Sequence, residues 1–285
     1  MKVFEKKTDL ESHLLNCGLS TAGFVPTMGA LHLGHLTLAK RAVSECSVVI
    51  VSIFVNPTQF NDKKDLERYP RTLENDLKLL SEVLRDDDVV FTPRVEEVYP
   101  EPDTRIFDFG SIDKSMEGEH RPGHFNGVAQ VVSRLFDLVK PDVAYFGQKD
   151  FQQLAIIKEM VRQTGSKVSI VGCPIIREED GLAMSSRNML LRPEHRKAAG
   201  IIYKSLLLSV PLIKKKGAPE AREFFKKSVE AISGFSVQYF ELVDDTMLIP
   251  LTNLSQANPL KNYFICVAVY AGEIRLIDNI QISLE

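Results

Sequence analysis

Short apolar runs alternate with helical patterns over the first 180 residues. The runs are rich in β-branched and aromatic residues and almost free of charge, as in Ser47–Val55. Such runs predict strands that are buried on both faces, which is typical of a parallel sheet. Between them, apolar residues recur at spacings of three and four and predict helices. The predicted strands are 3–4, 22–25, 47–55, 88–91, 142–146 and 167–173, with 174–177 continuing the last one, and the predicted helices are 9–15, 33–43, 70–84, 125–139 and 151–162.

The pattern changes after Pro193. Two helical segments, 193–210 and 219–233, are followed by strand-like runs at 237–243, 263–270 and 274–278. Helices followed by consecutive strands indicate a small α+β unit rather than more βαβ units. We therefore predict an α/β protein with a Rossmann-like parallel-sheet domain at 1–176 and a smaller C-terminal α+β lid domain at 177–285.

The turn after the first long strand carries candidate chemistry. Gly29 and Gly34 allow a close approach of the backbone to a ligand, because neither has a Cβ. His32 and His35 fall on one face at the start of the next predicted helix. Unpaired N–H groups and the helix dipole favour an anion at such a position. The sequence thus favours a phosphate site here, although a single histidine near a helix start is usually a capping or surface residue.

Polar residues also follow later strands, where ligands of open α/β sheets bind. Asn56 and Gln59 follow 47–55, although Asn-Pro is also ordinary turn chemistry. Arg121 and His124 precede a predicted helix and end a long connection, 103–124. Long connections are often functional, so these two basic groups are candidate phosphate contacts.

Two more candidates come from the second half of the parallel-sheet region. Lys149 lies at a helix start, where a cation is unfavourable unless an anion is bound. Of Gln152 and Gln153, one turn further on, only one can face the edge of the sheet. The loop Met184–Arg187 combines two hydroxyls with a guanidinium, groups that suit phosphate oxygens, although a surface turn with a capping Ser would look the same.

Composition narrows the class of protein. The 285 residues are 44% hydrophobic and 26% charged, as in soluble globular proteins, and the formal net charge of −3 gives no support for nucleic acid or an anionic membrane as a partner. The four cysteines lie far apart, which favours thiols in a reducing compartment. Met1–Asp9 is charged and resembles no signal peptide, and no apolar run reaches the length of a membrane helix. We expect a cytoplasmic protein.

The candidate stretches together suit phosphates and a small polar substrate. They contain neither a nucleophile with an adjacent base nor a metal-ligand spacing. They fit nucleotidyl transfer by positioning and charge neutralisation.

The His-Leu-Gly-His stretch resembles the H-x-G-H signature of the nucleotidylyltransferase and class I aminoacyl-tRNA synthetase superfamily. Met184–Arg187 resembles the second, mobile phosphate loop of that superfamily, with Arg where the usual pattern ends in a basic Lys. Five longer strings closely resemble the pantothenate synthetase (pantoate–β-alanine ligase) family: PTMGALHLGH, FVNPTQF, HRPGHFNGV, YFGQKDFQQL and DGLAMSSRN.

This resemblance implies an ATP-dependent ligase of pantothenate biosynthesis. The carboxylate of (R)-pantoate would attack the α-phosphorus of ATP to give pantoyl adenylate, and the amine of β-alanine would then give pantothenate and AMP. It implies that the catalytic residues are His35, His32, Lys149 and Arg187. It further implies ATP binding by Met28, Gly29, Ala30, Leu31, His32, Leu33, Gly34, His35, Gly147, Gln148, Lys149, Asp150, Ile176, Met184, Ser185, Ser186 and Arg187.

For the other substrates, the resemblance implies pantoate binding by Gln59, Gln153 and Asn56, with Gln59 also near β-alanine. Arg121 and His124 are further candidates. Mg²⁺ would be held through the ATP phosphates, and the family is usually homodimeric. Two alternatives remain open: another superfamily transferase, such as a cytidylyltransferase or an aminoacyl-tRNA synthetase, and a nucleotide-binding module without chemistry.

Overall fold

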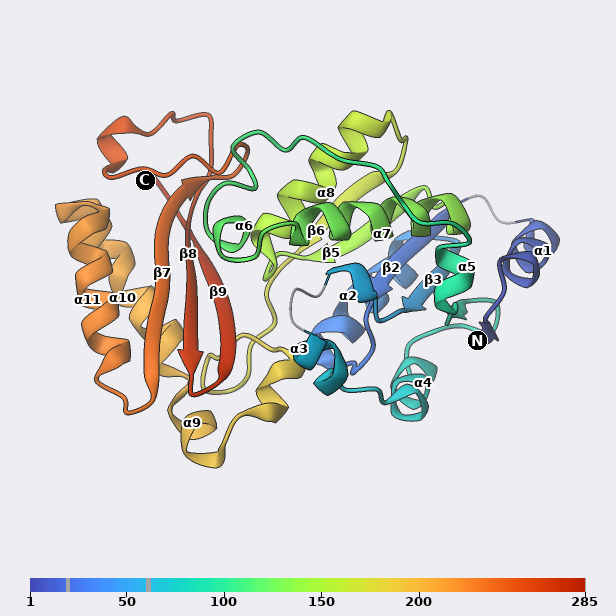
Figure 1. Ribbon diagram of the computed structural model, residues 1–285, viewed down its shortest axis with the longest axis horizontal. Helices are drawn as coiled ribbons and strands as arrows, with labels where there is room; N and C mark the ends of the chain where they lie inside the picture. Colours follow the sequence, from blue (N-terminus) through green and yellow to red (C-terminus); the bar gives the residue numbers. More distant parts are fainter. Residues whose placement is uncertain (19–20, 60–62, 285) are drawn as a thin grey trace. The chain divides into compact units, whose positions relative to one another are not determined.

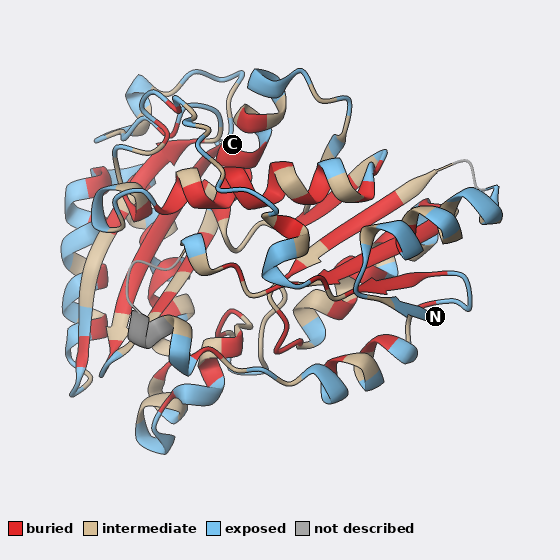
Figure 2. Ribbon diagram, turned by 45° about the vertical axis from the view of Figure 1, so that its right-hand side comes forward, coloured by how far each residue is buried: buried red, intermediate tan, exposed pale blue. Residues whose placement is uncertain are grey.

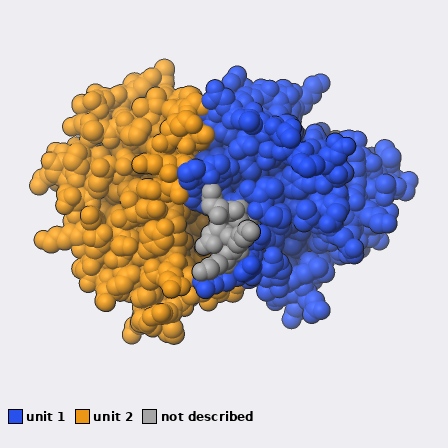
Figure 3. Space-filling view, in the orientation of Figure 1, with its two compact units in different colours: residues 1–109, 121–148, 156–174 blue, residues 110–120, 149–155, 175–285 orange. Residues whose placement is uncertain are grey.

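The computed structural model describes residues 1–18, 21–59 and 63–284, and the chain forms two compact units (Figure 3). Unit 1 contains residues 1–109, 121–148 and 156–174. Unit 2 contains residues 110–120, 149–155 and 175–285. Two short segments from within the parallel-sheet region, 110–120 and 149–155, thus belong to the unit formed mainly by the C-terminal part.

Unit 1 is built on a six-stranded sheet with the order β1-β4-β3-β2-β5-β6, in which all neighbours are parallel (Figure 1). The strands are β1 (Lys2–Phe4), β2 (Ala22–Thr27), β3 (Val48–Ile53), β4 (Val89–Phe91), β5 (Val143–Gly147) and β6 (Ser169–Cys173). The helices between them are α1 (Lys7–Cys17), α2 (Leu33–Glu45), η1 (Pro57–Gln59), α3 (Lys63–Arg68), α4 (Leu73–Ser81), α5 (Val95–Val98), α7 (His124–Val139) and α8 (Phe151–Thr164). The first residues of α8 belong to unit 2.

Successive side chains of the central strands point to opposite faces of the sheet, and both faces are apolar. Val25, Val49 and Val51 pack with α2 and α4 in one buried cluster. Phe24 points to the other face and meets Phe136 of α7 with ring centroids 6.1 Å apart. Helices therefore cover both faces, which explains why the inner strands β2 to β5 are apolar almost throughout and lie mostly in the buried colour of Figure 2.

The strand order places the candidate residues. The chain fills the sheet from β2 through β3 to β4 on one side, and then returns to add β5 and β6 on the other. The order therefore reverses between β2 and β5, and a ligand crevice is expected outside the carboxyl ends of strands at such a point. Residues 28–35, 56–59 and 147–150 follow the carboxyl ends of β2, β3 and β5.

Unit 2 is built on a three-stranded antiparallel sheet, β7-β8-β9. Its core joins this sheet to α10 and α11, and Phe225, Phe240 and Ile265 are among the buried residues. The elements are α6 (Glu117–His120), η2 (Ser186–Leu190), α9 (Pro193–Ala198), α10 (Ile201–Lys216), α11 (Ala218–Glu230), β7 (Phe235–Asp244), η3 (Leu254–Gln256), β8 (Tyr263–Ala271) and β9 (Ile274–Ile282).

The predicted fold class is confirmed, with local differences. The predicted helix 193–210 is two helices, because the chain breaks at Ala199–Gly200, where a Cβ on Gly200 would lie 2.6 Å from the carbonyl oxygen of Asp180. The predicted strand ends at Cys173, since Arg177 instead bridges Ala183 in a short hairpin. The domain boundary after residue 176 stays a prediction. Within the described residues, no helix has both the length and the apolar character that a membrane span requires.

Candidate active site

The turn after β2 is fixed by a buried carboxylate. Gly29 and Ala30 both adopt positive φ angles, 78° and 49°. Asp76 of α4, only 1% exposed, accepts the N–H groups of Ala30 and Leu31 at 2.9 and 2.8 Å. A Cβ on Gly29 would lie 3.0 Å from this carboxylate, so the position favours glycine both by space and by conformation. The result is a rigid turn that leads directly into the start of α2.

The two histidines cap the helix that follows. His32 is the N-cap of α2, and its Nδ1 accepts the N–H of Gly34 at 3.1 Å. The Nδ1 of His35 in turn accepts the N–H of His32 at 3.4 Å, and the ring centroids lie 4.1 Å apart. This is a capping box in which both reciprocal partners are imidazoles. Because each Nδ1 accepts a hydrogen bond, the ring proton of each neutral histidine lies on Nε2.

Gln59 lies next to the same turn. Its Nε2 donates to the sulfur of Met28 at 2.8 Å, and its Oε1 accepts from Nδ2 of Asn56 at 3.3 Å. Asn56 is 1% exposed, and its Oδ1 accepts from Thr58 and from the hydroxyl of Tyr99. Burial raises the pKa of Tyr99, which keeps this hydroxyl protonated as a donor. Asn56 therefore orients Gln59, and its own polar atoms face the protein.

His124 is also connected to Gln59. It is the first residue of α7, and its Nδ1 donates to the carbonyl of Gln59 at 2.8 Å, since a carbonyl can only accept. Gly127 lets α7 approach closely, because a Cβ there would lie 2.7 Å from the carbonyl oxygen of Thr58. Arg121 lies one turn earlier, where its carbonyl accepts the N–H of His124. The string FVNPTQF ends at Phe60, which lies outside the described residues.

In unit 2, the start of α8 presents Lys149 and Gln153. The Lys149 side chain is 19% exposed and its Nζ lies 3.4 Å from Oδ2 of Asp150. Gln152 is buried and bonds the segment 112–117, where it accepts from the N–H of Glu117 and donates to the carbonyls of Ile112 and Ser115. Gln153 is half-buried, and its side chain makes no hydrogen bond within the described part of the chain. Of the two glutamines, Gln153 is the one available to a ligand.

The loop Met184–Arg187 is held by a hairpin and a cap. The N–H of Met184 donates to the carbonyl of Ile176 at 2.9 Å, which places these two predicted residues side by side. Ser185 is the N-cap of η2, and its hydroxyl accepts the N–H of Arg187 at 3.3 Å. Ser186 is buried, whereas Arg187 is half-buried. The serine cap therefore shapes the loop that carries the guanidinium.

Strand β9 connects this loop to Lys149. Asp278 is buried and forms a two-point ion pair with Arg177, at 2.7 and 3.0 Å. Burial raises the pKa of Asp278, and the arginine acts against that shift. The next residue, Asn279, donates from Nδ2 to the carbonyl of Lys149 at 3.0 Å. Lys149 and Arg177 are thus fixed to adjacent residues of β9.

The predicted residues therefore lie in two groups, one in each unit. Unit 1 holds Met28, Gly29, Ala30, Leu31, His32, Leu33, Gly34, His35, Asn56, Gln59, Arg121, His124, Gly147 and Gln148. Unit 2 holds Lys149, Asp150, Gln153, Ile176, Met184, Ser185, Ser186 and Arg187. Gln148 and Lys149 are consecutive, so the chain itself passes from one group to the other.

Comparison with known proteins identifies the family. The sequence profile of the pantoate-beta-alanine ligase family matches residues 2–281. The pantothenate synthetase of Porphyromonas gingivalis W83 is 52% identical over 284 residues, 99% of each chain. The chain belongs to the pantoate–beta-alanine ligase family.

Solved structures of the family agree in fold. The pantothenate synthetase of Thermus thermophilus matches with a TM-score of 0.88 and 43% identity, covering 98% of this chain and 99% of that one. The pantoate-beta-alanine ligase of Francisella tularensis, described as complexed with beta-gamma ATP and beta-alanine, matches with a TM-score of 0.79 and 36% identity, covering 98% and 97%.

Two residues important for the geometry of the candidate site were not singled out by sequence. Asp76 lies 46 residues after Ala30 in a helix whose pattern gives no reason for a buried carboxylate. Asn279 lies 130 residues after Lys149, in the last strand. In the sequence, each could have been noticed as a polar residue within an apolar pattern. Asp76 lies near Leu77 and Leu80, and Asn279 lies beside Ile280. The partners of such residues become visible only in three dimensions.

Proposed function

We propose that this protein joins pantoate to β-alanine through a pantoyl adenylate, with the residues of the two groups in the roles that their chemistry supports. ATP binding and the ligase activity accord with the family, and the residue roles are our proposal. Pantoate brings an ionised carboxylate, so its attack on the α-phosphorus needs no general base. What the protein must supply is charge neutralisation and alignment.

The capping box of His32 and His35 is the observation that carries the ATP site. Each Nδ1 accepts a hydrogen bond from a backbone N–H group. Each imidazole would therefore donate from Nε2–H to a phosphate oxygen at the start of α2. The helix dipole favours an anion at this end. Lys149 and Arg187 would add positive charge against the departing pyrophosphate. Met28–Gly34, Gly147, Gln148, Asp150, Ile176, Met184, Ser185 and Ser186 would line the nucleotide.

Gln59 and Gln153 are the proposed pantoate residues. An amide both donates and accepts, which suits the hydroxyls and carboxylate of pantoate, and Gln59 would also lie near β-alanine. Asn56 and His124 hold the side chain and the carbonyl of Gln59, so we assign them to its orientation rather than to direct contact. Arg121 stays a candidate for a phosphate contact.

Mg²⁺ fits as a partner of the nucleotide. Among the proposed ATP residues, Asp150 is the one carboxylate, and it lies beside Lys149. Mg²⁺ readily keeps water and phosphate oxygens as ligands, so Asp150 would supplement a metal held mainly by ATP. When bound, the ion would supply charge neutralisation on the phosphates. A homodimer, a cytoplasmic location and a domain boundary after residue 176 are further proposals that rest on the family resemblance and on the sequence.

Pyrophosphate and AMP release test the proposed function. With ATP, Mg²⁺ and (R)-pantoate, we expect a burst of pyrophosphate stoichiometric with enzyme. Adding β-alanine should convert the burst into steady release of AMP and pantothenate. Folded protein that binds ATP but releases no pyrophosphate in either case would contradict the ligase reaction. Omission of pantoate is the control for hydrolysis of ATP by water.

A further inference from the structure

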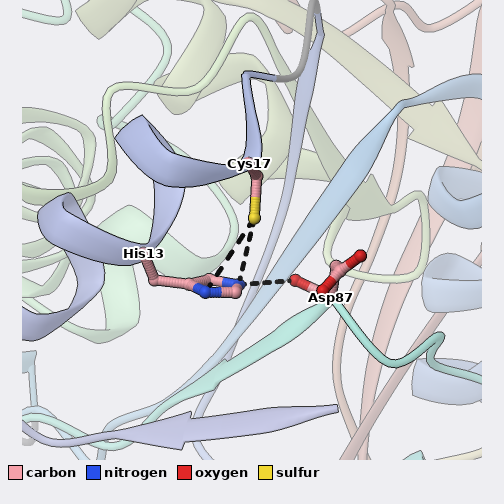
Figure 4. Close-up of side chains that lie close together, drawn as sticks. All are labelled: His13, Cys17 and Asp87. Atoms are coloured by element: carbon pink, nitrogen blue, oxygen red, sulfur yellow. Dashed lines mark hydrogen bonds between the residues drawn. The ribbon is translucent and has the colours of Figure 1, made fainter.

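A second cluster of reactive side chains lies far along the sheet from the proposed ATP residues of unit 1. His13 and Cys17 are one helical turn apart on α1, and Asp87 lies two residues before β4 (Figure 4). A ring nitrogen, the thiol sulfur and a carboxylate oxygen of these residues all lie within 4.8 Å of one another. We propose that His13, Cys17 and Asp87 form a binding site for a thiophilic divalent cation, with Zn²⁺ as the fitting ion.

The two sulfur–nitrogen distances bracket the separation between two ligands of one zinc ion. The Cys17 sulfur lies 3.9 Å from Nδ1 and 3.5 Å from Nε2 of His13. Tetrahedral zinc with Zn–S of about 2.3 Å and Zn–N of about 2.0–2.1 Å separates sulfur and nitrogen by about 3.6 Å. An ion can therefore take the place of the thiol proton next to the ring, after a small shift that brings Nδ1, the more distant nitrogen, closer to the sulfur.

The hydrogen bond of the histidine ring selects Nδ1 as the ligand atom. The Nε2 of His13 lies 2.9 Å from the backbone carbonyl of Asp87, and a carbonyl only accepts, so Nε2 carries the proton. In the neutral ring, the lone pair is then on Nδ1, within reach of the thiol. Histidine ligands of metals commonly donate their other N–H to a backbone carbonyl in this way. The Phe4 ring, 5.4 Å from the imidazole, restricts it further.

Asp87 would contribute twice, through its carbonyl to the ring and through its carboxylate to the ion. Its side chain is exposed, whereas His13 and Cys17 are half-buried, which leaves room for water as a fourth ligand. Such a mixed N, S and O set with one open position suits Zn²⁺ rather than Mg²⁺, which prefers oxygen alone. Asp86 adds a further negative charge in the sequence beside the site.

Binding must displace a proton. Burial, followed by the charge of Asp87, raises the pKa of the Cys17 thiol, while Lys2 acts in the opposite direction. The sulfur therefore enters as the protonated thiol: the S–H bond breaks, the S–Zn bond forms, and the proton passes to solvent. Binding of the ion therefore releases one proton from Cys17.

The site lies at the opposite end of the sheet from the catalytic residues of unit 1. Helix α1 returns from β1 towards the start of β2, and Asp87 precedes β4, so the cluster lies at the amino ends of the strands. The proposed ATP residues follow the carboxyl ends. The expected effect of the ion is therefore on the stability of α1 and the adjacent strands and not on the ligation itself.

A Co²⁺ titration tests the proposal. The full chain, purified without a histidine tag, reduced and freed of metal with a chelator, should develop a near-ultraviolet thiolate-to-cobalt absorption that saturates at one ion per chain and is reversed by Zn²⁺. Cys17→Ser should abolish this absorption, and His13→Ala and Asp87→Asn should weaken binding at least about tenfold. Zn²⁺ should raise the melting temperature of the wild type but not of Cys17→Ser.

Asp86→Asn is the matched control, because it removes a neighbouring exposed carboxylate and should retain most of the affinity. Far-ultraviolet circular dichroism and pantothenate formation should be unchanged in Cys17→Ser, which shows that loss of metal binding is not loss of fold. Three results would overturn the proposal: no absorption up to millimolar Co²⁺, an absorption that survives in Cys17→Ser, or wild-type affinity in His13→Ala or Asp87→Asn.

Discussion

Individual side chains in the proposed active site are held by neighbours that sequence reasoning assigns to other roles. Asn56 is a site candidate by its position after a strand, and the family resemblance implies pantoate binding, yet its polar atoms are used by Gln59, Thr58 and Tyr99. Position after a strand thus indicates the right region of the molecule but not the direction of a side chain. The direction of a side chain depends on how the surrounding elements pack: the Asn56 side chain is buried in the protein, whereas Gln59 is half-exposed.

Gln59→Ala should weaken pantoate binding about tenfold while it leaves ATP affinity nearly unchanged. An amide that makes one or two hydrogen bonds to a substrate contributes about 1–1.5 kcal/mol. Titration of each substrate separately measures the two effects. Gln163→Ala, which removes an exposed glutamine of α8, is the control. An equal loss for ATP and pantoate would remove Gln59 from the pantoate role.

Lys149→Ala should slow adenylate formation by roughly 10²–10³-fold, because it removes a charge aimed at developing phosphate charge. Single-turnover pyrophosphate release with pantoate and without β-alanine is the measurement. Lys158→Ala, which removes an exposed lysine of the following helix α8, should react at the wild-type rate. A normal single-turnover rate in Lys149→Ala would exclude Lys149 from the chemical step.

At the scale of elements, turns and helix starts are specified by residues from other elements. The turn Gly29–Leu31 depends on Asp76 of α4, and residues 103–105 are attached to α7 through Asp103. The helical and strand patterns predict the elements themselves well, since they depend on local periodicity. They do not predict these attachments, because a carboxylate and its N–H partners can be far apart in sequence.

Asp76→Asn should destabilise the protein by about 2 kcal/mol and weaken ATP binding. One amide oxygen can replace only part of a carboxylate that accepts two backbone N–H groups and the Thr72 hydroxyl, and the amide N–H₂ would face a donor. Urea unfolding and ATP titration give the two values. Glu74→Gln, an exposed residue of the same helical turn, should match the wild type, and a stable Asp76→Asn protein with normal ATP affinity would contradict the role of the turn.

Asp103 should make the stability of unit 1 depend on acid pH. The Arg105 guanidinium, supported by Arg134, holds the pKa of this carboxyl well below its usual range. A depressed pKa stabilises the folded state above the unfolded-state pKa of about 3.9, and this contribution is lost as pH falls below that value. Asp103→Asn should therefore cost about 2 kcal/mol near pH 7 and clearly less near pH 3. Equal costs in urea unfolding at the two pH values would contradict this assignment.

At the scale of the whole molecule, much of the architecture was predictable from sequence. The parallel sheet follows from apolar runs separated by helical patterns, and the position of the candidate site follows from the strand ends at which polar motifs occur. Which segments of the chain form unit 2 was not predictable. Segments 110–120 and 149–155 belong to it because of contacts made by side chains such as Glu117 and Gln152. Glu117 is buried and pairs with Arg275 of β9, a contact between residues 158 positions apart.

The inclusion of Lys149 in unit 2 connects the last strand to the proposed catalytic role of this lysine. Asn279 fixes the carbonyl of Lys149, and its neighbour Asp278 fixes Arg177 at the base of the Met184–Arg187 loop. Asn279→Ala should therefore lower kcat about three- to tenfold through misplacement of Lys149, with little change in KM for ATP. Steady-state kinetics and single-turnover pyrophosphate release measure the separate effects on kcat and KM.

Asn279→Asp keeps the size of the side chain but removes the hydrogen-bond donor, so it should behave like Asn279→Ala. Gln281→Ala on the same strand is the control. If Asn279→Ala raised KM for ATP and left kcat unchanged, Asn279 would contribute to nucleotide binding rather than to the placement of Lys149.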